Sequence, residues 1–75
     1  MNKKLAKAFG QILRKIRMDK KMSQEELAFE SGLDRTYISM LERGIRQPTL
    51  STVFELKRAL GVRVADLVFP LERSF

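Results

Sequence analysis

The segment from Ser23 to Pro48 constrains the fold of this chain more than any other part of the sequence. It contains two residues of the types that cap helices well, Ser23 and Asp34, with Gly32 between them. Glu26 follows Ser23 by three residues, which is the spacing of a capping box, a reciprocal pair of hydrogen bonds at the start of a helix. The segment therefore predicts two short helices joined by a turn with a left-handed glycine.

The second of these helices has two different sides. We expect it to run from about Arg35 to Arg43 and to stop at Gly44. At about 100° per residue, its apolar side chains gather on one side: Tyr37, Ile38 and Leu41. The opposite side carries forked donors, hydroxyls and a thioether, and no carboxylate: Arg35, Thr36, Ser39, Met40 and Arg43. Base edges in the major groove of DNA are recognised by such groups, although a solvated helix face is the alternative interpretation.

The first helix of the segment favours the DNA interpretation. It is expected to begin at Gln24 and to reach Glu30 or Ser31 before the turn at Gly32. Two short helices, a short turn containing glycine and an exposed polar face on the second helix together make a helix-turn-helix unit. The caps, the glycine and the apolar spacing all agree with this interpretation.

From about Gly10 to Phe69 the chain resembles the Cro/CI-type helix-turn-helix regulators, also called the XRE family. The motifs that carry this resemblance are S-Q-E-E-L-A, G-L-D-R-T-Y-I-S, L-E-R-G and P-T-L. In the motif D-R-T-Y-I-S and in its small size, the chain more closely resembles the controller proteins of restriction–modification systems. The resemblance implies a compact, all-α, five-helix domain of the lambda-repressor-like type. It also implies a regulator of transcription that binds double-stranded DNA.

A long first helix is expected from about Lys3 to Asp19 or Lys20, because its apolar residues follow helical spacing. Gly10 lies inside this helix, where glycine costs about 1 kcal/mol relative to alanine. We attribute the presence of glycine there to close packing against a neighbour. This helix is also the basic element of the chain. Residues 1–21 hold eight of the 15 Lys and Arg residues and one of the nine acids, a distribution that favours attraction to phosphates.

Two more helices are expected after Pro48. One runs from about Leu50 to Leu60, capped by Thr49 and stopped by Gly61, with these residues facing inward: Leu50, Val53, Leu56 and Leu60. The other is short, runs from Val64 to Phe69 and ends before Pro70.

The composition limits the function classes. The chain has 75 residues, a net charge of +6, and neither His nor Cys, so two common catalytic bases and nucleophiles are absent. Its acids lack metal-ligand spacing and its glycines do not form a phosphate-binding loop. We expect one domain over residues 1–75, no enzymatic activity, no metal or cofactor, and little room for a small-molecule ligand. Lacking a signal peptide and a membrane-spanning apolar stretch, the protein is expected in the cytoplasm, without membrane contact.

The resemblance also suggests roles for residues outside the base-reading set. It implies an ion pair between Arg17 and Glu42 that holds the first helix against the third. Gln24, with a free amide at a helix N-terminus, is expected to contact the DNA backbone, as are four residues in and after the second helix of the unit: Tyr37, Arg43, Arg46 and Gln47.

The C-terminal segment, about residues 62–75, holds more apolar residues than a small domain needs. We expect Leu67 to turn inward and three residues to form a homodimer interface: Val68, Phe69 and Leu71. A dimer would read two half-sites of a near-palindromic operator. The alternative is an antitoxin-type or other small protein-interaction module that also binds DNA. A toxin-wrapping tail would distinguish it, but only six residues follow Phe69 in this sequence.

Overall fold

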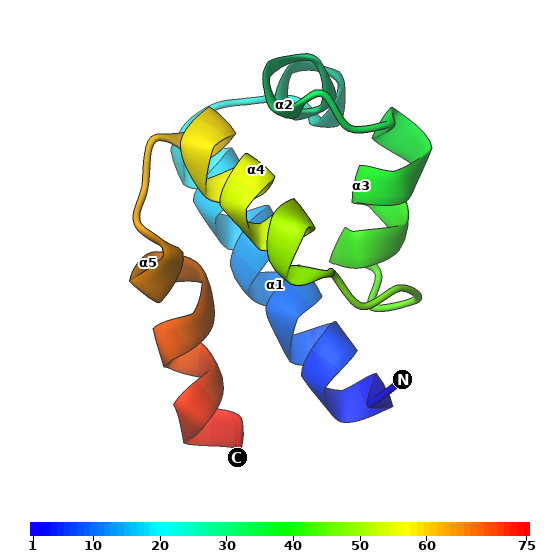
Figure 1. The fold of residues 1–75 in the computed structure, drawn as a ribbon, viewed down its shortest axis with the longest axis vertical. Coiled ribbons are helices and arrows are strands. Elements are labelled where there is room, and N and C mark those ends of the chain that lie inside the picture. The colour runs from blue at the N-terminus through cyan, green and yellow to red at the C-terminus, as the bar shows by residue number, and fades with distance from the viewer.

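The computed structural model describes residues 1–75, apart from the side chain of Ser74. It contains five α-helices and a terminal 3-10 helix: α1 Lys3–Asp19, α2 Gln24–Ser31, α3 Arg35–Glu42, α4 Leu50–Leu60, α5 Val64–Val68 and η1 Phe69–Ser74. Figure 1 shows α1 crossing the middle of the molecule behind α4, with α3 on one side and α5 with η1 on the other. The expected all-α, five-helix fold is confirmed. In the described chain no helix is long and apolar enough to cross a membrane.

The predicted caps form as hydrogen bonds at the starts of α2 and α3. The Ser23 hydroxyl accepts from the Glu26 amide at 3.0 Å, and the Glu26 carboxylate accepts from the Ser23 amide at 2.8 Å. Asp34 accepts from the amide of Thr36 at 2.8 Å. Gly32 has a φ of 73°, so it makes the left-handed turn that other residues adopt at a cost. These local choices set the angle between α2 and α3.

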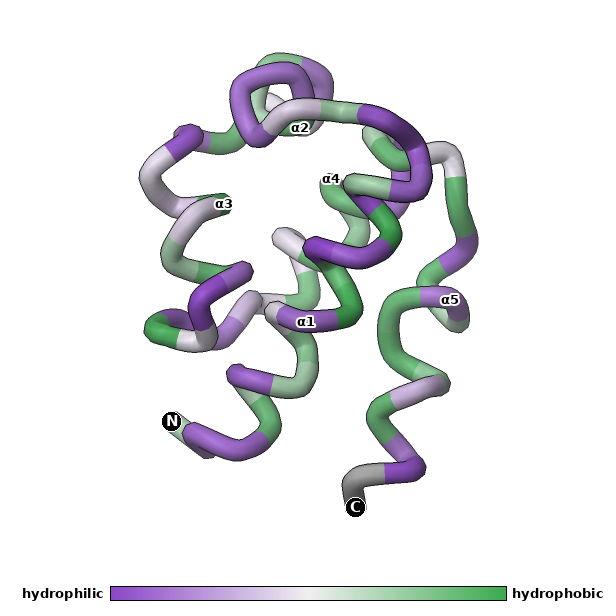
Figure 2. The backbone as a smooth tube through the Cα atoms, turned by 180° about the vertical axis from the view of Figure 1, so that it is seen from behind, coloured by the Kyte–Doolittle hydropathy of each residue, from purple (hydrophilic) through white to green (hydrophobic). Residues whose placement is uncertain are grey.

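The apolar sides of the helices meet in one core: Phe9, Leu13, Leu27, Ala28, Ile38, Leu41, Val53, Leu56, Leu60 and Leu67. Hydrophobic and hydrophilic residues alternate along the tubes of α1, α3 and α4 in Figure 2, as expected of helices with one buried side. Leu67 is fully buried, as expected from its sequence position. The core holds α3 by one side only, which leaves its other side at the surface.

Gly10 explains how α1 and α3 can touch. A Cβ atom at this position would lie 2.6 Å from the Glu42 carbonyl oxygen and closer still to that of Leu41. Only a residue without a side chain fits at this crossing, so the packing role expected for Gly10 is confirmed.

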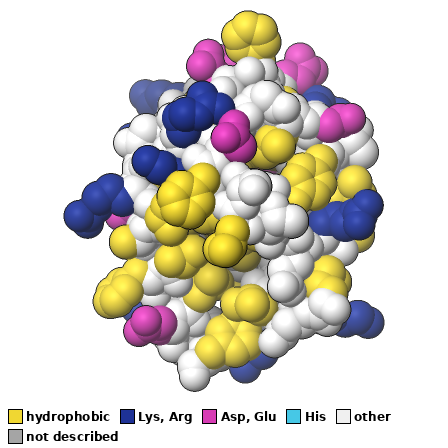
Figure 3. Space-filling model, viewed as in Figure 1, with side chains coloured by type: hydrophobic (Ala, Val, Ile, Leu, Met, Phe, Trp, Pro, Cys, Tyr) yellow, Lys and Arg dark blue, Asp and Glu magenta, His cyan; other side chains and the backbone are white. Residues whose placement is uncertain are grey.

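Leu50 differs from its prediction. We expected it to face inward, but 80% of its surface is exposed. It lies on the same side of α4 as Phe54, four residues later, whereas the buried Val53, Leu56 and Leu60 lie on another side. Leu50 therefore joins an apolar surface over α4 and α5, visible as the yellow side chains gathered in Figure 3.

The C-terminal end also differs from its prediction. The fifth helix ends at Val68, before Pro70 as expected, but it is followed by a 3-10 helix that we did not expect, η1, in which Pro70 occupies one of the first two positions. Proline is tolerated there because the first turn of a helix does not use its amide hydrogen atoms. Leu71, expected to face outward, is half-buried and packs against the core. Val68 and Phe69 remain exposed.

Replacing Gly10 by alanine should destabilise the protein, although alanine is the better helix former. The added methyl group meets two backbone carbonyls that cannot move separately from α3. We expect a loss of about 1–3 kcal/mol in the free energy of unfolding, measured by urea denaturation. Gln11→Ala, at the neighbouring exposed position, is the control and should change stability by less than about 0.5 kcal/mol. A stabilised Gly10→Ala variant would contradict this contact.

Candidate nucleic-acid interface

The outer side of α3 is the surface on which the expected base-reading residues meet. Ile38 and Leu41 are fully buried and anchor the helix in the core. On the other side Arg35 and Thr36 are exposed, while Ser39 and Met40 are half-buried. These four side chains therefore share one face and offer a guanidinium, two hydroxyls and a thioether to a ligand.

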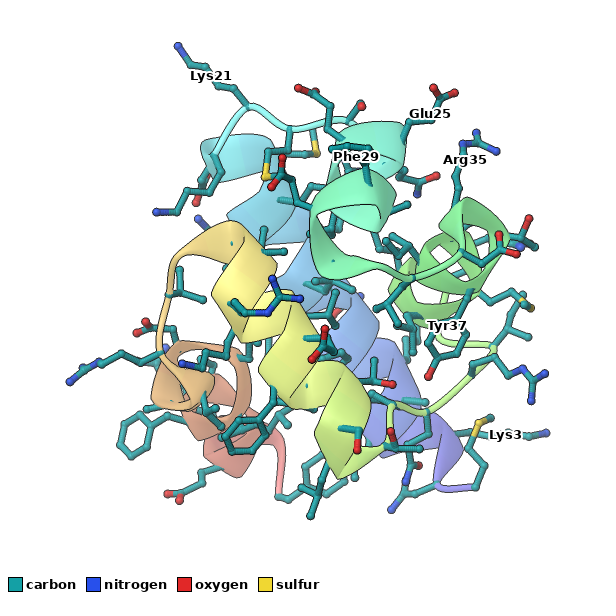
Figure 4. All side chains as sticks on the ribbon, turned by 45° about the horizontal axis from the view of Figure 1, so that its top comes forward. Lys3, Lys21, Glu25, Phe29, Arg35 and Tyr37 are labelled. Carbon is teal, nitrogen blue, oxygen red and sulfur yellow. The ribbon has the colours of Figure 1, made fainter. Side chains whose placement is uncertain are left out.

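Arg35 lies at the N-terminal turn of α3 with its guanidinium in solvent. Its Nε atom is 3.9 Å from the Glu25 carboxylate, and both side chains are more than half exposed. Figure 4 shows the two side chains at the same edge of the molecule, pointing outward from α2 and α3. An exposed ion pair this long contributes little, so Arg35 is free to exchange Glu25 for another acceptor.

The Glu42 carboxylate joins three helices below this surface. Arg17 of α1 donates to it twice, from Nε at 2.6 Å and from Nη2 at 3.0 Å, and also donates from Nη1 to the Met22 carbonyl at 2.7 Å. Only 3% of the Glu42 side chain and 11% of the Arg17 side chain are exposed. The hydrogen bond to Glu42 raises the pKa of Arg17, and it outweighs the opposing effect of burial.

Gln24, at the first position of α2, does not have the free amide that we expected. Its Nε2 atom donates to Glu42 at 3.1 Å, so the carboxylate that binds Arg17 also holds this amide. The side chain is half-buried and keeps one further N–H donor. Glu42 thus fixes where the remaining donor of Gln24 can lie.

Tyr37 connects α3 to the beginning of α4. Its ring packs against the core, and its hydroxyl lies 3.2 Å from the hydroxyl of Thr52. The Thr52 hydroxyl is in turn 3.1 Å from that of Thr49, the cap of α4. The hydroxyl that we expected at a phosphate therefore has a partner within the chain and reaches a ligand only by sharing it.

The loop after α3 carries the remaining expected backbone contacts. Arg43, Arg46 and Gln47 are all exposed. The side-chain oxygen of Gln47 accepts from the backbone N–H of Asn2 at 3.0 Å, which leaves its NH₂ group as the donor for a ligand. Sequence reasoning missed this contact with the start of α1. The sequence indicates this contact only through Asn2, a residue type that caps helices, whose side chain caps α1 by accepting from the Leu5 amide.

The Arg17–Glu42 pair should be strongly coupled. Replacing either residue alone, as Arg17→Met or Glu42→Gln, leaves the partner buried without its counter-charge and should cost about 3–5 kcal/mol in the free energy of unfolding. The double variant should cost less than the sum of the two, by about 0.5–3 kcal/mol, in a chemical-denaturation cycle.

The control for this cycle is the pair of Lys15 and Asp19, joined at 2.9 Å with both side chains largely exposed. Removing either side chain there should change stability by no more than about 1 kcal/mol. Equal, additive effects in the two cycles would mean that burial does not strengthen the Arg17–Glu42 pair.

Comparison with known proteins agrees with this geometry. A model of the helix-turn-helix family matches residues 13–67. The control protein C.BamHI of Bacillus amyloliquefaciens is 52% identical over 61 residues, which are 80% of this chain and 75% of that protein.

Solved structures show the same arrangement of helices. The restriction–modification controller protein C.AhdI of Aeromonas hydrophila has a TM-score of 0.81 at 45% identity, over 83% of this chain and 94% of that one. The clp gene regulator ClgR of C. glutamicum has a TM-score of 0.86 at 35% identity, over 95% and 92% of the two chains. The chain therefore belongs to the Cro/CI-type, or XRE, helix-turn-helix family of DNA-binding transcriptional regulators.

Proposed function

We propose that this protein is a homodimeric, sequence-specific regulator that reads a near-palindromic operator with α3 and acts as the controller protein of a restriction–modification system. The observation that carries the DNA-binding part is the two-sided environment of α3. One side is fixed in the core by Ile38 and Leu41. The other presents donors at the surface, and no carboxylate of α3 competes there because Glu42 is buried under Arg17.

Within this proposal the residues divide into two groups. Base readout falls to the exposed side of α3: Arg35, Thr36, Ser39 and Met40. Contacts with the sugar–phosphate backbone fall to residues at its margins: Gln24, Tyr37, Arg43, Arg46 and Gln47. Gln24, Tyr37 and Gln47 have side-chain polar atoms that already bond to protein atoms, so they would act as preorganised contacts.

The dimer is supported by the apolar surface on α4, α5 and η1. Five of its large side chains are at least 36% exposed: Leu50, Phe54, Val68, Phe69 and Phe75. An apolar groove lies beside them between the starts of α1 and α4 and the C-terminal segment. A two-fold axis would place this patch against its own copy, so that residues of about 62–75 cover α4 of the partner. One recognition helix contacts too few base pairs for specificity. Two half-sites, each read by one subunit, double the number of base pairs that are read.

The controller role is supported by the relatives. Three of them are named control proteins, C.BamHI, C.MunI and C.SmaI, with identities between 36% and 52%. The structure of C.Esp1396I, described as a restriction–modification controller, also matches with a TM-score of 0.83. We propose the same role for this chain. Neighbouring reading frames for a restriction endonuclease and a methyltransferase would support it, and their absence would leave a regulator of other genes.

The experiment that tests DNA reading is selection of bound sequences from a pool of random duplexes. The selected sequences should share an inverted repeat whose half-site centres lie about one helical turn apart. Arg35→Ala should lower affinity for the best sequence by about 1–3 kcal/mol and relax one position in each half-site.

Arg58→Ala is the matched control, because it removes an exposed arginine that pairs with Glu55 on α4. It should leave the selected sequence unchanged. If Arg35→Ala weakens binding to all duplexes equally, Arg35 contacts phosphate and does not read bases.

Phe69→Asp should disrupt the dimer and leave the helices intact, because 67% of the Phe69 surface is exposed in the single chain. Sedimentation should show a monomer, circular dichroism should keep its helical signal, and operator binding should fall to that of one half-site. Phe29→Asp is the control, since Phe29 is an exposed phenylalanine on α2, outside the patch. A dimeric Phe69→Asp variant would place the interface elsewhere, and an unfolded one would place Phe69 in the core.

A further inference from the structure

We propose that the first two turns of α1 form an additional contact with the DNA backbone, in which Lys3 and Lys7 bind phosphates beside the α3–α4 loop. This inference rests on the proposed function, since it extends the surface that α3 presents. It goes beyond the residues that the recognition helix and its loop supply. It also assigns a task to part of the positive charge concentrated in α1.

The helical geometry of α1 places Lys3 and Lys7 on the side that faces α3. At about 100° per residue, five positions fall within an arc of about 80°: Lys3, Lys7, Gly10, Arg14 and Arg17. Two of them touch α3 directly. The backbone at Gly10 lies against the carbonyls of Leu41 and Glu42, and Arg17 binds the Glu42 carboxylate. The remaining members of the arc are all basic: Arg14 lies between these two residues, and Lys3 and Lys7 continue this side of α1 toward its N-terminus.

Two contacts hold the start of α1 against the loop that carries Arg43, Arg46 and Gln47. A Cβ atom on Gly44 would lie 2.8 Å from the Cα atom of Lys7, so the two backbones touch. The backbone N–H of Asn2 donates to the Gln47 side chain at 3.0 Å. Lys3 follows Asn2 directly. It therefore lies near Gln47, for which we propose a phosphate contact.

Three other basic residues of α1 have partners inside the protein. Lys15 pairs with Asp19, Arg17 pairs with Glu42, and the Nζ atom of Lys4 lies 5.3 Å from the centre of the Phe75 ring. In the described part of the chain, Lys3 and Lys7 are exposed and have no carboxylate within ion-pair distance. Figure 4 shows Lys3 pointing outward at the same edge of the molecule as Tyr37 and Arg35.

The chemistry of this surface fits the DNA backbone. Lysine ammonium groups are mobile point charges that attract phosphates without defining a base sequence. Beside Arg43 and Arg46 they would lengthen the cationic margin of the α3 surface along one strand. Because each phosphate contact releases counterions, the contribution of Lys3 and Lys7 is measurable as salt dependence.

The test is the dependence of the binding constant on salt concentration for the double variant Lys3→Gln/Lys7→Gln. Binding would be measured by fluorescence anisotropy with two duplexes, one of mixed sequence and one selected by the wild-type protein. Lys15→Gln/Lys21→Gln is the matched control. It removes the same charge at Lys15, which lies on α1 outside the arc of Lys3 and Lys7, and at Lys21, in the turn after α1, which Figure 4 shows at the opposite edge from Lys3.

We expect the slope of log K against log salt to become shallower by about 1.8 in the Lys3/Lys7 variant, which is about 0.9 for each lost phosphate contact. The change should be equal on both duplexes, with the selected base sequence and the circular dichroism unchanged. The control should keep the wild-type slope. If both double variants shift equally, or if neither shifts, this inference is overturned while the proposed function stands. If the wild-type protein binds neither duplex, both are overturned.

Discussion

The Glu42 carboxylate is the group on which the arrangement of the DNA-binding helices depends. It accepts from Arg17 of α1 and Gln24 of α2 while belonging to α3, so one buried anion fixes three elements. Its position is possible because Gly10 lets α1 approach the α3 backbone within contact distance. Removing Arg17 would leave a buried charge without its counter-charge, which costs more than an exposed pair contributes. The same arrangement removes the one carboxylate of α3 from the exposed side of the helix, where it would repel phosphates.

The caps and the core divide the work of orienting α3. Asp34 fixes where the helix begins, and Gly32 sets the direction in which the chain enters it. Ile38 and Leu41 then fix its rotation, because both must be buried. Rotation decides which residues face outward, and Arg35 is exposed as a result. Tyr37 adds a further restraint through Thr52, so that the first turn of α4 moves with α3. Because α3 is held from several sides, it loses little conformational entropy when it binds a ligand.

Most of the fold was predictable from the sequence because its signals are local. The Ser23 capping box, the Asp34 cap and Gly32 each act within a few residues, and all formed as expected. Where the sequence misled us, the deciding contact was distant or absent. Leu50 has helical spacing to Val53, but the core ends before it and a separate apolar surface begins. Gln24 lies at an ordinary first helical position, and only the folded chain brings Glu42 to it. The 3-10 helix η1 was not expected, because the permitted place of Pro70 in a new first turn depends on the preceding chain.

The two exposed surfaces that remain differ in chemistry, and this difference argues that they serve different partners. The side over α4 and α5 presents large exposed apolar side chains, Leu50, Phe54 and Phe69. The side around α3 presents basic and hydroxyl groups together with the exposed side chain of Ile45, in the loop after α3. Lys4 and Phe75 pair with each other, so α1 keeps that lysine on the apolar side while Lys3 and Lys7 follow the α3 arc. The helical position of each of these lysines therefore decides on which of the two surfaces its charge lies. Because the buried Arg17 and Gly10 fix which way α1 is rotated, the packing of the core also determines which lysines can reach a phosphate.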